Sequence, residues 1–588
     1  MSSIIESAVS LAVSISSALG GSSLIAKKLH VEGAQHRVKI ERKASFTTRD
    51  GVRLSADIFH PADLKKSPSI LVRIPFSETV ETCFLEEVIG RLWAERGWTA
   101  VIQGTRGRFK SGGEFYPLLF EREDGIETLD WLAKQPWYNG EIGAWGGSAY
   151  GQTLWSIADQ TAPAIGTMEL YFTSTDFHRM LYVGNAFSLY TALGWTFRSH
   201  DKHKDEEEWP TTARIIKAAS RWPMKDADSR DLGHSVAFFQ DWIRHKNFDK
   251  YWRQIDGDKQ SSKFHGPVLF LAGWFDPFLQ TELADFGNAS SMDVTHKTRI
   301  VIGPWSHARD VELPNFRSND EKFRSKSVAS SISWFKETLG KEALSKRNST
   351  QDEPKVSIFV MGANQWRAEN EWPLARTKYT PFFLNCNGHG NGKLTAEAPA
   401  RDFVDQFTYD PENPVPTVGG AMIGSAAGMF RQNVIEQRAD VFTYTTSPME
   451  QDTEITGPVK LTLYVSSDAP CTDFTAKLID VHADGNAYNL CSGILRKSYF
   501  SNGLEKSTPV KIEIDLTATS NVFKKGHRIR LDVSSSDFPR FDRNPNTGHD
   551  PATEKNSRAA HQQIYSGPKC QSQIILPITP VKSANSRP

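Results

Sequence analysis

The run from Gly143 to Gly151, Gly-Ala-Trp-Gly-Gly-Ser-Ala-Tyr-Gly, constrains the fold of this chain more than any other stretch. A short apolar strand ends at Trp145, and a buried helix is expected from Gln152 to Ala158. A serine on such a sharp turn needs small neighbours because the backbone is strained and closely packed. Gly146 and Gly151 flank Ser148 and supply them. The pattern therefore predicts a nucleophile elbow that exposes the serine hydroxyl at a sheet edge.

A serine hydroxyl is a weak nucleophile, so it needs a base and a group that orients the base. The apolar strand 267–272 leads to Asp276, and the β-branched strand 298–302 leads to His307. In α/β-hydrolases the acid and then the histidine follow the serine along the chain, on loops after later strands. Active sites of open α/β sheets lie at the carboxyl ends of the strands. Ser148, Asp276 and His307 are thus the predicted catalytic triad.

These motifs carry a family resemblance. Gly-Gly-Ser-x-x-Gly around Ser148, Gly-Trp-Phe-Asp ending at Asp276 and Gly-Pro-Trp-Ser-His ending at His307 are similar to the cocaine-esterase-like (CocE/NonD) hydrolases. That family is related to α-amino-acid ester hydrolases and X-prolyl dipeptidyl aminopeptidases. The similarity extends over roughly residues 37–580 and includes Phe-Pro-Arg-Phe-Asp-Arg-Asn at 538–544. It implies an α/β-hydrolase fold with a helical cap insertion and a C-terminal β-sandwich of the jelly-roll type.

The chain departs from the family pattern around the position expected for the oxyanion. The resemblance places a tyrosine, whose hydroxyl helps to bind the oxyanion, where this chain has Phe76. Ala149 replaces a frequent aromatic residue, and its backbone N–H remains as one oxyanion donor. Gly104 stands where the family has an aspartate. The predicted triad is complete, but the polar groups that the family places around the oxyanion are only partly present.

The favoured function is serine hydrolysis of an ester, amide or thioester through an acyl-enzyme. Aromatic residues near the triad suit a bulky hydrophobic small-molecule substrate; the expected contacts are Phe76, Tyr150, Trp274 and Phe278. One alternative keeps the triad for acyl transfer, cyclisation or a C–C bond change in specialised metabolism. Another is a non-catalytic binding protein that retains the fold. Aminopeptidase activity is disfavoured, because the sequence offers no evident acidic cluster for a substrate ammonium.

Hydrophobic periodicity divides the chain. Alternating strand and helix signals favour a mostly parallel sheet with helices on both faces. A region rich in Trp, Phe, His and charge has helical periodicity instead, and its histidines His200, His203, His234 and His245 are expected at the surface. From about residue 355 apolar residues alternate with polar ones, as in an all-β sandwich. The predicted parts are an N-terminal arm (1–36), the hydrolase domain (37–173 and 253–345), the cap (174–252) and the sandwich (355–582), with a linker at 346–355.

Composition restricts the partners. The 588 residues include 69 basic and 69 acidic ones, so no net field favours nucleic acid or an anionic membrane. Five widely spaced cysteines predict neither a disulfide framework nor a zinc site. No metal-ligand spacing, phosphate loop or dinucleotide fingerprint is found, so no cofactor is expected. We expect a cytoplasmic protein, with secretion less favoured, without a stable membrane span and with a homodimer possible.

Overall fold

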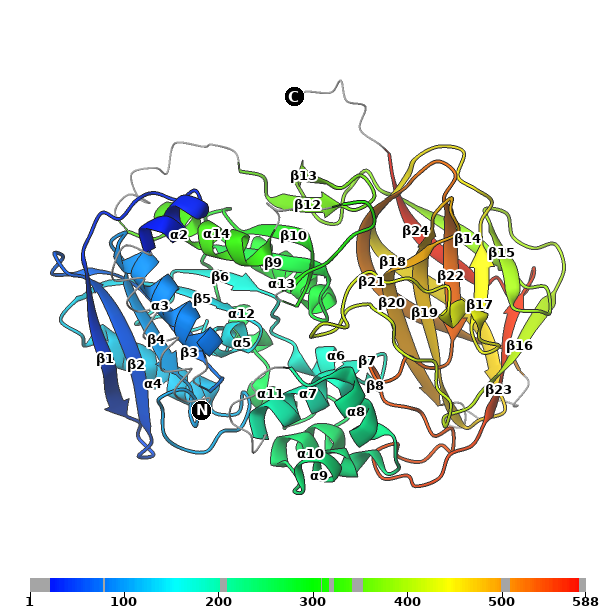
Figure 1. Cartoon of the computed structure of the whole chain (residues 1–588), viewed down its shortest axis with the longest axis horizontal. Helices are drawn as coiled ribbons and strands as arrows, with labels where there is room; N and C mark the ends of the chain where they lie inside the picture. The colour runs from blue at the N-terminus through cyan, green and yellow to red at the C-terminus, as the bar shows by residue number, and fades with distance from the viewer. Residues whose placement is uncertain are drawn as a thin grey trace.

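The computed structural model describes residues 22–77, 80–200, 209–307, 309–316, 322–340, 353–498 and 508–580. Figure 1 shows a helix-covered sheet on the left, a group of short helices below its centre and a half built from strands on the right. Most of the N-terminal arm, the charged run 202–208 and most of the linker lie outside the described residues. Among the described helices, none combines the length and the apolar character that a membrane span requires.

The first sheet is mixed and mostly parallel. Its strands follow the order β1-β2-β4-β3-β5-β6-β9-β10-β12-β13, with β11 paired to β10. The pairs from β4 through β12 are parallel, whereas β1–β2, β2–β4 and β12–β13 are antiparallel. The bounds are β1 Val38–Thr47, β2 Arg53–Pro61, β3 Ser67–Ile74, β4 Thr99–Gly104, β5 Tyr138–Gly147, β6 Thr167–Tyr171, β9 Val268–Phe275, β10 Arg299–Ser306, β11 Arg309–Asp310, β12 Val356–Val360 and β13 Gln365–Glu369.

Helices cover both faces of this sheet, as the alternating pattern predicts. On one face Ile70 and Val72 of β3 belong to a buried cluster with Trp93 and Phe335. On the other face Leu71 belongs to a cluster with residues of α4, α5 and α13. Strands buried on both faces are nearly continuously apolar, as β3 and β9 are. The helices are α2 Ser22–Lys28, α3 Val80–Ala94, α4 Glu121–Ala133, α5 Ala149–Trp155, α13 Leu279–Met292 and α14 Phe323–Thr338.

One strand lies in a different sheet from the one predicted. The alternation of Val356, Ile358 and Val360 was expected to open the sandwich, but these residues form β12, which pairs in parallel with β10. The alternation of apolar and polar residues along a strand shows which residues face a core, but it does not show which sheet the strand joins. The first strand of the second sheet is instead β14, which begins at Lys378.

The segment between β6 and β9 is mainly helical, and its aromatic residues form a core of their own that includes Phe238, Phe239 and Trp242. It also holds a two-stranded hairpin, β7–β8, that the sequence did not reveal. Hydrogen bonds tie this hairpin to the strand-built half, because the Asp542 carboxylate accepts from the Phe187 N–H at 2.8 Å. The elements are α6 Phe177–Leu181, β7 Tyr182–Val183, β8 Ala186–Phe187, α7 Leu189–His200, α8 Thr212–Ala219, η2 Met224–Asp226, α9 Ala227–Leu232, α10 Ala237–Arg244, α11 Trp252–Ile255 and α12 Asp258–Ser261.

The C-terminal half contains the second large sheet, in the order β16-β23-β18-β24-β14-β15-β17-β22-β19-β20 with β21 paired to β18. Leu461, Leu463 and Leu531 are fully buried, as their alternation predicts. The jelly-roll arrangement stays a prediction. The bounds are β14 Lys378–Asn385, β15 Asn391–Thr395, β16 Phe403–Tyr409, η3 Ile435–Gln437, β17 Phe442–Thr445, β18 Thr453–Ser467, β19 Cys471–Val481, β20 Ala487–Ser498, β21 Val510–Phe523, β22 Arg528–Ser534, β23 Ala560–Ser566 and β24 Gln573–Thr579.

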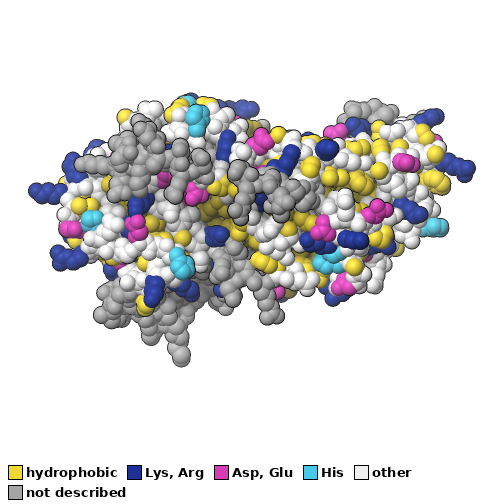
Figure 2. Space-filling model, turned by 90° about the horizontal axis from the view of Figure 1, so that it is seen from above, with side chains coloured by type: hydrophobic (Ala, Val, Ile, Leu, Met, Phe, Trp, Pro, Cys, Tyr) yellow, Lys and Arg dark blue, Asp and Glu magenta, His cyan; other side chains and the backbone are white. Residues whose placement is uncertain are grey.

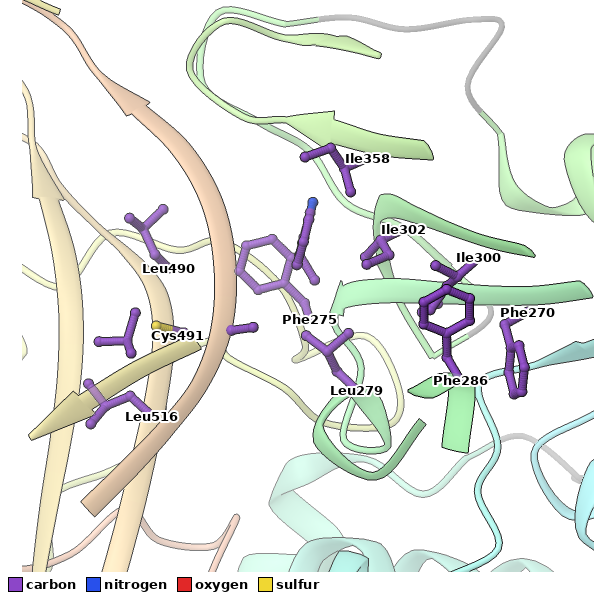
Figure 3. Packing of buried hydrophobic residues seen from close by; sticks show 14 of the residues in the cluster. Phe270, Phe275, Leu279, Phe286, Ile300, Ile302, Ile358, Leu490, Cys491 and Leu516 are labelled. Carbon is purple, nitrogen blue, oxygen red and sulfur yellow. The ribbon is translucent and has the colours of Figure 1, made fainter. Parts of the chain in front are cut away.

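The two large sheets share one hydrophobic core. Figure 3 shows Phe275 at the end of β9 on the side facing Leu490 and Cys491 of β20, with Leu279 beside it. All four residues belong to one buried cluster. Backbone hydrogen bonds between the Met361 region and β21 join the halves as well, with N–O distances of 3.0 and 2.8 Å. The C-terminal half therefore supports the end of the strand that leads directly into Asp276.

Charged side chains of both signs are interspersed over the surface. Figure 2 shows this for one face of the molecule, where Lys and Arg alternate with Asp and Glu. The pattern agrees with the equal numbers of basic and acidic residues in the sequence, 69 of each. Four of the five cysteines, Cys386, Cys471, Cys491 and Cys570, are free thiols.

Candidate active site

Ser148 lies on the turn between β5 and α5 with φ of 51° and ψ of −130°. Residues other than glycine rarely adopt this conformation, which costs about 1–3 kcal/mol and persists only where the surroundings enforce it. Two hydrogen bonds do so here. The Ser148 N–H donates to the Tyr171 carbonyl at 2.9 Å, and the Thr173 hydroxyl donates to the Ser148 carbonyl at 2.7 Å. The strained turn predicted from the glycine pattern is present.

The glycines around Ser148 are required by close packing. A Cβ on Gly147 would lie 1.9 Å from a ring carbon of Tyr171, and one on Gly151 would lie 2.5 Å from the Thr173 methyl carbon. At Gly146 a Cβ would lie 2.8 Å from the Cβ of Tyr150. Atoms cannot approach so closely, so a larger residue at any of these positions would displace β6 or α5. The sequence pattern has a steric cause.

The structure brings Ser148, His307 and Asp276 together. His307 Nε2 lies 2.9 Å from Ser148 Oγ, and His307 Nδ1 lies 2.6 Å from Asp276 Oδ2. The other carboxylate oxygen of Asp276 accepts from the Phe278 N–H at 2.8 Å. The Asp276 side chain is fully buried, while that of His307 is 11% exposed. An imidazole hydrogen-bonded on both nitrogens in this way can take a proton from the serine hydroxyl.

Aromatic rings enclose the imidazole. The ring centroids of Phe172 and Phe278 lie 5.7 and 5.8 Å from that of His307. Both phenylalanines are buried, at 1% and 2% exposure. The rings limit water around the His307–Asp276 pair, and charge interactions are stronger where water is excluded.

Two further buried carboxyl groups lie behind Asp276 on α13. Burial, together with the charges of Asp276 and Asp285, raises the pKa of Glu282 well above its usual range. Burial raises the pKa of Asp285 to about 7, against hydrogen bonds that favour its charged form. The Asp285 carboxyl accepts from the Thr175 N–H and hydroxyl at 2.9 and 2.7 Å. Burial thus favours the protonated forms of Glu282 and Asp285. Reasoning from the sequence missed Glu282 and Asp285, because acids inside a helix usually face solvent.

The opposite side of Ser148 is aromatic. Phe76 follows β3, which pairs with β5. Its ring centroid lies 5.4 Å from that of Tyr150 and 5.7 Å from that of Trp195 on α7. Phe76 is half-buried and has no side-chain donor, whereas Tyr150 is 8% exposed. Phe76, Tyr150 and Phe278 thus lie around the triad, and Trp195 joins them.

Trp274 lies elsewhere. It is 2% exposed, its indole N–H donates to the Phe359 carbonyl at 2.8 Å, and its ring packs against Trp372 at 5.8 Å. These contacts place it in the core beside β12, where it fixes the end of β9. Its proximity to Asp276 in the sequence suggested a substrate contact, but Trp274 belongs to β9 and Asp276 to the loop after that strand, where the side-chain alternation of the strand no longer holds.

The position that the family gives to an acid has no carboxylate here. Gly104 ends β4, and the nearby Arg106 instead forms ion pairs with Asp124 and Asp50, each at 2.6 Å. Ala149 begins α5, so its N–H belongs to the first turn, where no carbonyl within the helix can accept it.

Three parts of the chain contribute to the surroundings of Ser148. Ala149, Phe278 of the loop after β9 and Met422 of the C-terminal half belong to one buried cluster together with the aromatic core of the α6–α12 segment. A site formed between domains is a common location for small-molecule binding.

Comparisons with known proteins agree with this geometry. The family model of X-Pro dipeptidyl-peptidase (S15 family) matches residues 50–309, and that of the X-Pro dipeptidyl-peptidase C-terminal non-catalytic domain matches residues 348–575. Cocaine esterase of Rhodococcus sp. (strain MB1 Bresler) is 34% identical, over 90% of this chain and 97% of that protein.

Solved structures share the fold. An aminopeptidase from a marine sediment Thaumarchaeota archaeon gives a TM-score of 0.76 at 23% identity, covering 93% of this chain and 97% of the other. An α-amino acid ester hydrolase gives a TM-score of 0.74 at 21% identity, with the same coverage. The fold and the serine site define an α/β-hydrolase-type serine hydrolase. The chain belongs to the cocaine-esterase-like (CocE/NonD) family.

Proposed function

We propose that this enzyme hydrolyses an ester of a bulky, largely hydrophobic small molecule, with Ser148, His307 and Asp276 as its catalytic triad. The supporting observation is the continuous hydrogen-bonded path from Ser148 Oγ through both nitrogens of His307 to Asp276, with distances of 2.9 and 2.6 Å. The relationship to cocaine esterase supports an ester rather than a peptide. An amide or thioester would follow the same chemistry.

The reaction has two halves. Ser148 Oγ attacks the ester carbonyl while His307 Nε2 takes the hydroxyl proton, and Asp276 holds the imidazolium through its Nδ1–H. The Ala149 N–H donates to the oxyanion. Collapse expels the alcohol, which leaves with the proton from His307, and an acyl-Ser148 forms. Water then attacks the acyl group, with His307 again as base, and releases the acid.

A fluorophosphonate probe tests the proposal directly. It should label the wild-type protein at Ser148, and Ser148→Ala should abolish both labelling and ester hydrolysis. Ser156→Ala is a matched control, because Ser156 ends the same helix and its hydroxyl only donates to the Thr153 carbonyl. Labelling that persists in Ser148→Ala protein would remove Ser148 as the nucleophile.

A second outcome for the acyl-enzyme is favoured by one observation. Phe76 has no donor where the family resemblance implies one, which indicates a reaction other than ordinary hydrolysis, such as acyl transfer or cyclisation. Product analysis with and without an added alcohol or amine separates the two. Hydrolysis alone in the presence of the nucleophile would exclude transfer.

The domain division belongs to the same proposal. The hydrolase part comprises 37–173 and 253–345 together with the strands β12 and β13, and the cap comprises 174–252. The C-terminal part is a jelly roll that begins with β14. A homodimer and a cytoplasmic location remain predictions from the sequence.

A further inference from the structure

An arginine that forms no ion pair within the described part of the chain lies beside the aromatic side of the site. Arg198 extends from α7, and its guanidinium carbon lies 4.5 Å from the centroid of the Phe76 ring. Phe76 in turn contacts Tyr150, two residues from Ser148, with ring centroids 5.4 Å apart. Arg198, Phe76 and Tyr150 therefore form a chain of contacts that reaches the start of α5, just after Ser148.

Arg198 makes no ion pair with any carboxylate of the described residues, and its Nε is buried without a hydrogen-bond partner. A cation–π contact of this kind uses the face of the guanidinium and none of its N–H groups. Among the described residues the buried Nε–H therefore has no acceptor, and a buried donor without an acceptor is destabilising. Natural proteins keep such groups where a ligand or another function uses them.

The surroundings of Arg198 are also positive. Arg108 stacks on Phe115 at 3.6 Å and donates to the carbonyl of Ser199 at 3.1 Å. The adjacent His200, expected at the surface, is instead partly buried. Burial, with smaller contributions from the charges of Arg108 and His234, lowers the pKa of His200 to about 4. His200 is therefore neutral at pH 7, and the two arginines provide a positive field.

We propose that Arg198 binds a carboxylate of the substrate, so that this enzyme prefers esters that carry an anionic group near the scissile bond. The planar guanidinium matches a carboxylate with two parallel hydrogen bonds. Phe76, Tyr150 and Trp195 would hold the apolar part of the same molecule. The inference rests on the proposed esterase function and names its substrate class as carboxylate-bearing aromatic or aliphatic esters.

Paired esters of equal shape test this preference. Mono-4-nitrophenyl glutarate carries a carboxylate on the acyl side, and 4-nitrophenyl methyl glutarate is its neutral match. On the alcohol side, 4-carboxyphenyl butyrate is compared with 4-methoxycarbonylphenyl butyrate. The wild type should give a kcat/KM at least about 10-fold higher for the anionic member of one pair, because hydrogen bonds to charged groups are stronger than those between neutral groups. The pair that shows the preference identifies the side of the ester that faces Arg198.

Variants separate charge recognition from a general structural role. Arg198→Gln should remove the preference for the anionic ester, mainly through a higher KM, with a much smaller effect on its neutral match. Arg198→Lys should retain part of the preference, because it keeps the charge and loses the planar fork. Arg253→Gln is the matched control, since Arg253 is an exposed arginine on α11 of the same segment. Equal kcat/KM for both members of each pair in the wild type, or equal losses on both in Arg198→Gln, would overturn the proposal.

Binding without turnover keeps this test independent of the proposed triad. In Ser148→Ala protein, calorimetry should show tighter binding of the anionic ester than of the neutral one, and Arg198→Gln added to that background should abolish the difference. If the wild type neither labels with fluorophosphonate nor hydrolyses any ester while this difference persists, the proposed function is wrong and Arg198 remains an anion site. If esters are hydrolysed but Ser148→Ala protein binds both members equally, the carboxylate inference alone fails.

Discussion

The two sides of Ser148 are built differently. On the His307 side one continuous series of hydrogen bonds links the Phe278 N–H, Asp276, His307 and the serine hydroxyl. On the Phe76 side there is an aromatic ring with no donor and a guanidinium whose buried Nε–H has no acceptor among the described residues. The proton-transfer side is complete in the protein alone, whereas the opposite side lacks polar partners that a substrate could supply. The difference indicates that chemistry and substrate recognition are under separate constraints in this enzyme.

Removing the nucleophile should have the largest effect on the His307 side of the site. Ser148→Ala should lower kcat/KM roughly 10⁵-fold or more, as for triad serines elsewhere. The protein should stay folded, since the turn is held by backbone and Thr173 contacts that alanine keeps. Circular dichroism and thermal unfolding check the fold. Activity within tenfold of the wild type would show that Ser148 is not the nucleophile.

Changing the orienting acid gives the next largest effect. Asp276→Asn should lower kcat roughly 10⁴-fold, because the amide cannot stabilise the imidazolium and favours the wrong tautomer of His307. Its oxygen can still accept from the Phe278 N–H, so the fold and the KM should change little. Steady-state kinetics on a 4-nitrophenyl ester measure both parameters. A change confined to KM would contradict the role of Asp276.

A hydrogen-bond donor can also be added on the Phe76 side of the site. Phe76→Tyr should raise kcat for neutral 4-nitrophenyl esters at least several-fold, because one oxyanion donor is typically worth about 10²–10³ in kcat and a new one is imperfectly placed. Tyr150→Phe is a matched control, since it removes a hydroxyl next to the same ring. If Phe76→Tyr is folded and no faster while the wild type already hydrolyses these esters well, another group supplies the second donor.

The smallest expected effect concerns the buried acids behind Asp276. A carboxyl whose pKa is about 7 in the folded protein and near 3.8 when unfolded binds its proton more tightly in the folded state. The free energy of unfolding contributed by Asp285 therefore falls as the pH rises from about 4 to 7 and is constant above that. Asp285→Asn should reduce the drop in melting temperature between pH 5 and 8. An unchanged drop would show that Asp285 is charged in the folded protein.

Much of the His307 side of the site could be predicted from the sequence, because its residues follow strands in a fixed order. Glycine spacing located Ser148, and apolar strands ending at Asp276 and His307 located its partners. Buried parallel strands are nearly continuous apolar runs, so they are recognised even in a single sequence.

The Phe76 side of the site could not be predicted, because it depends on contacts between segments that are distant in the sequence. Arg198 ends an otherwise apolar helix, and only the packing of α7 against the residue after β3 reveals it beside Phe76. Trp274 and the strand 356–360 show the same limit, since periodicity gives a buried face but neither its partner nor its sheet. Local pattern defined the chemistry, and tertiary packing defined what surrounds it.

The core shared by the two large sheets packs the C-terminal half against the end of β9, directly before the acid of the proposed triad. Phe275 packs toward β20, and the next residue is the acid of the proposed triad. Loosening the C-terminal half, by heat or by a cavity at Leu490 or Leu516, would shift Asp276 before the sheet itself melts. Inactivation should then precede global unfolding on a temperature ramp, so that turnover would report on the packing of the C-terminal half.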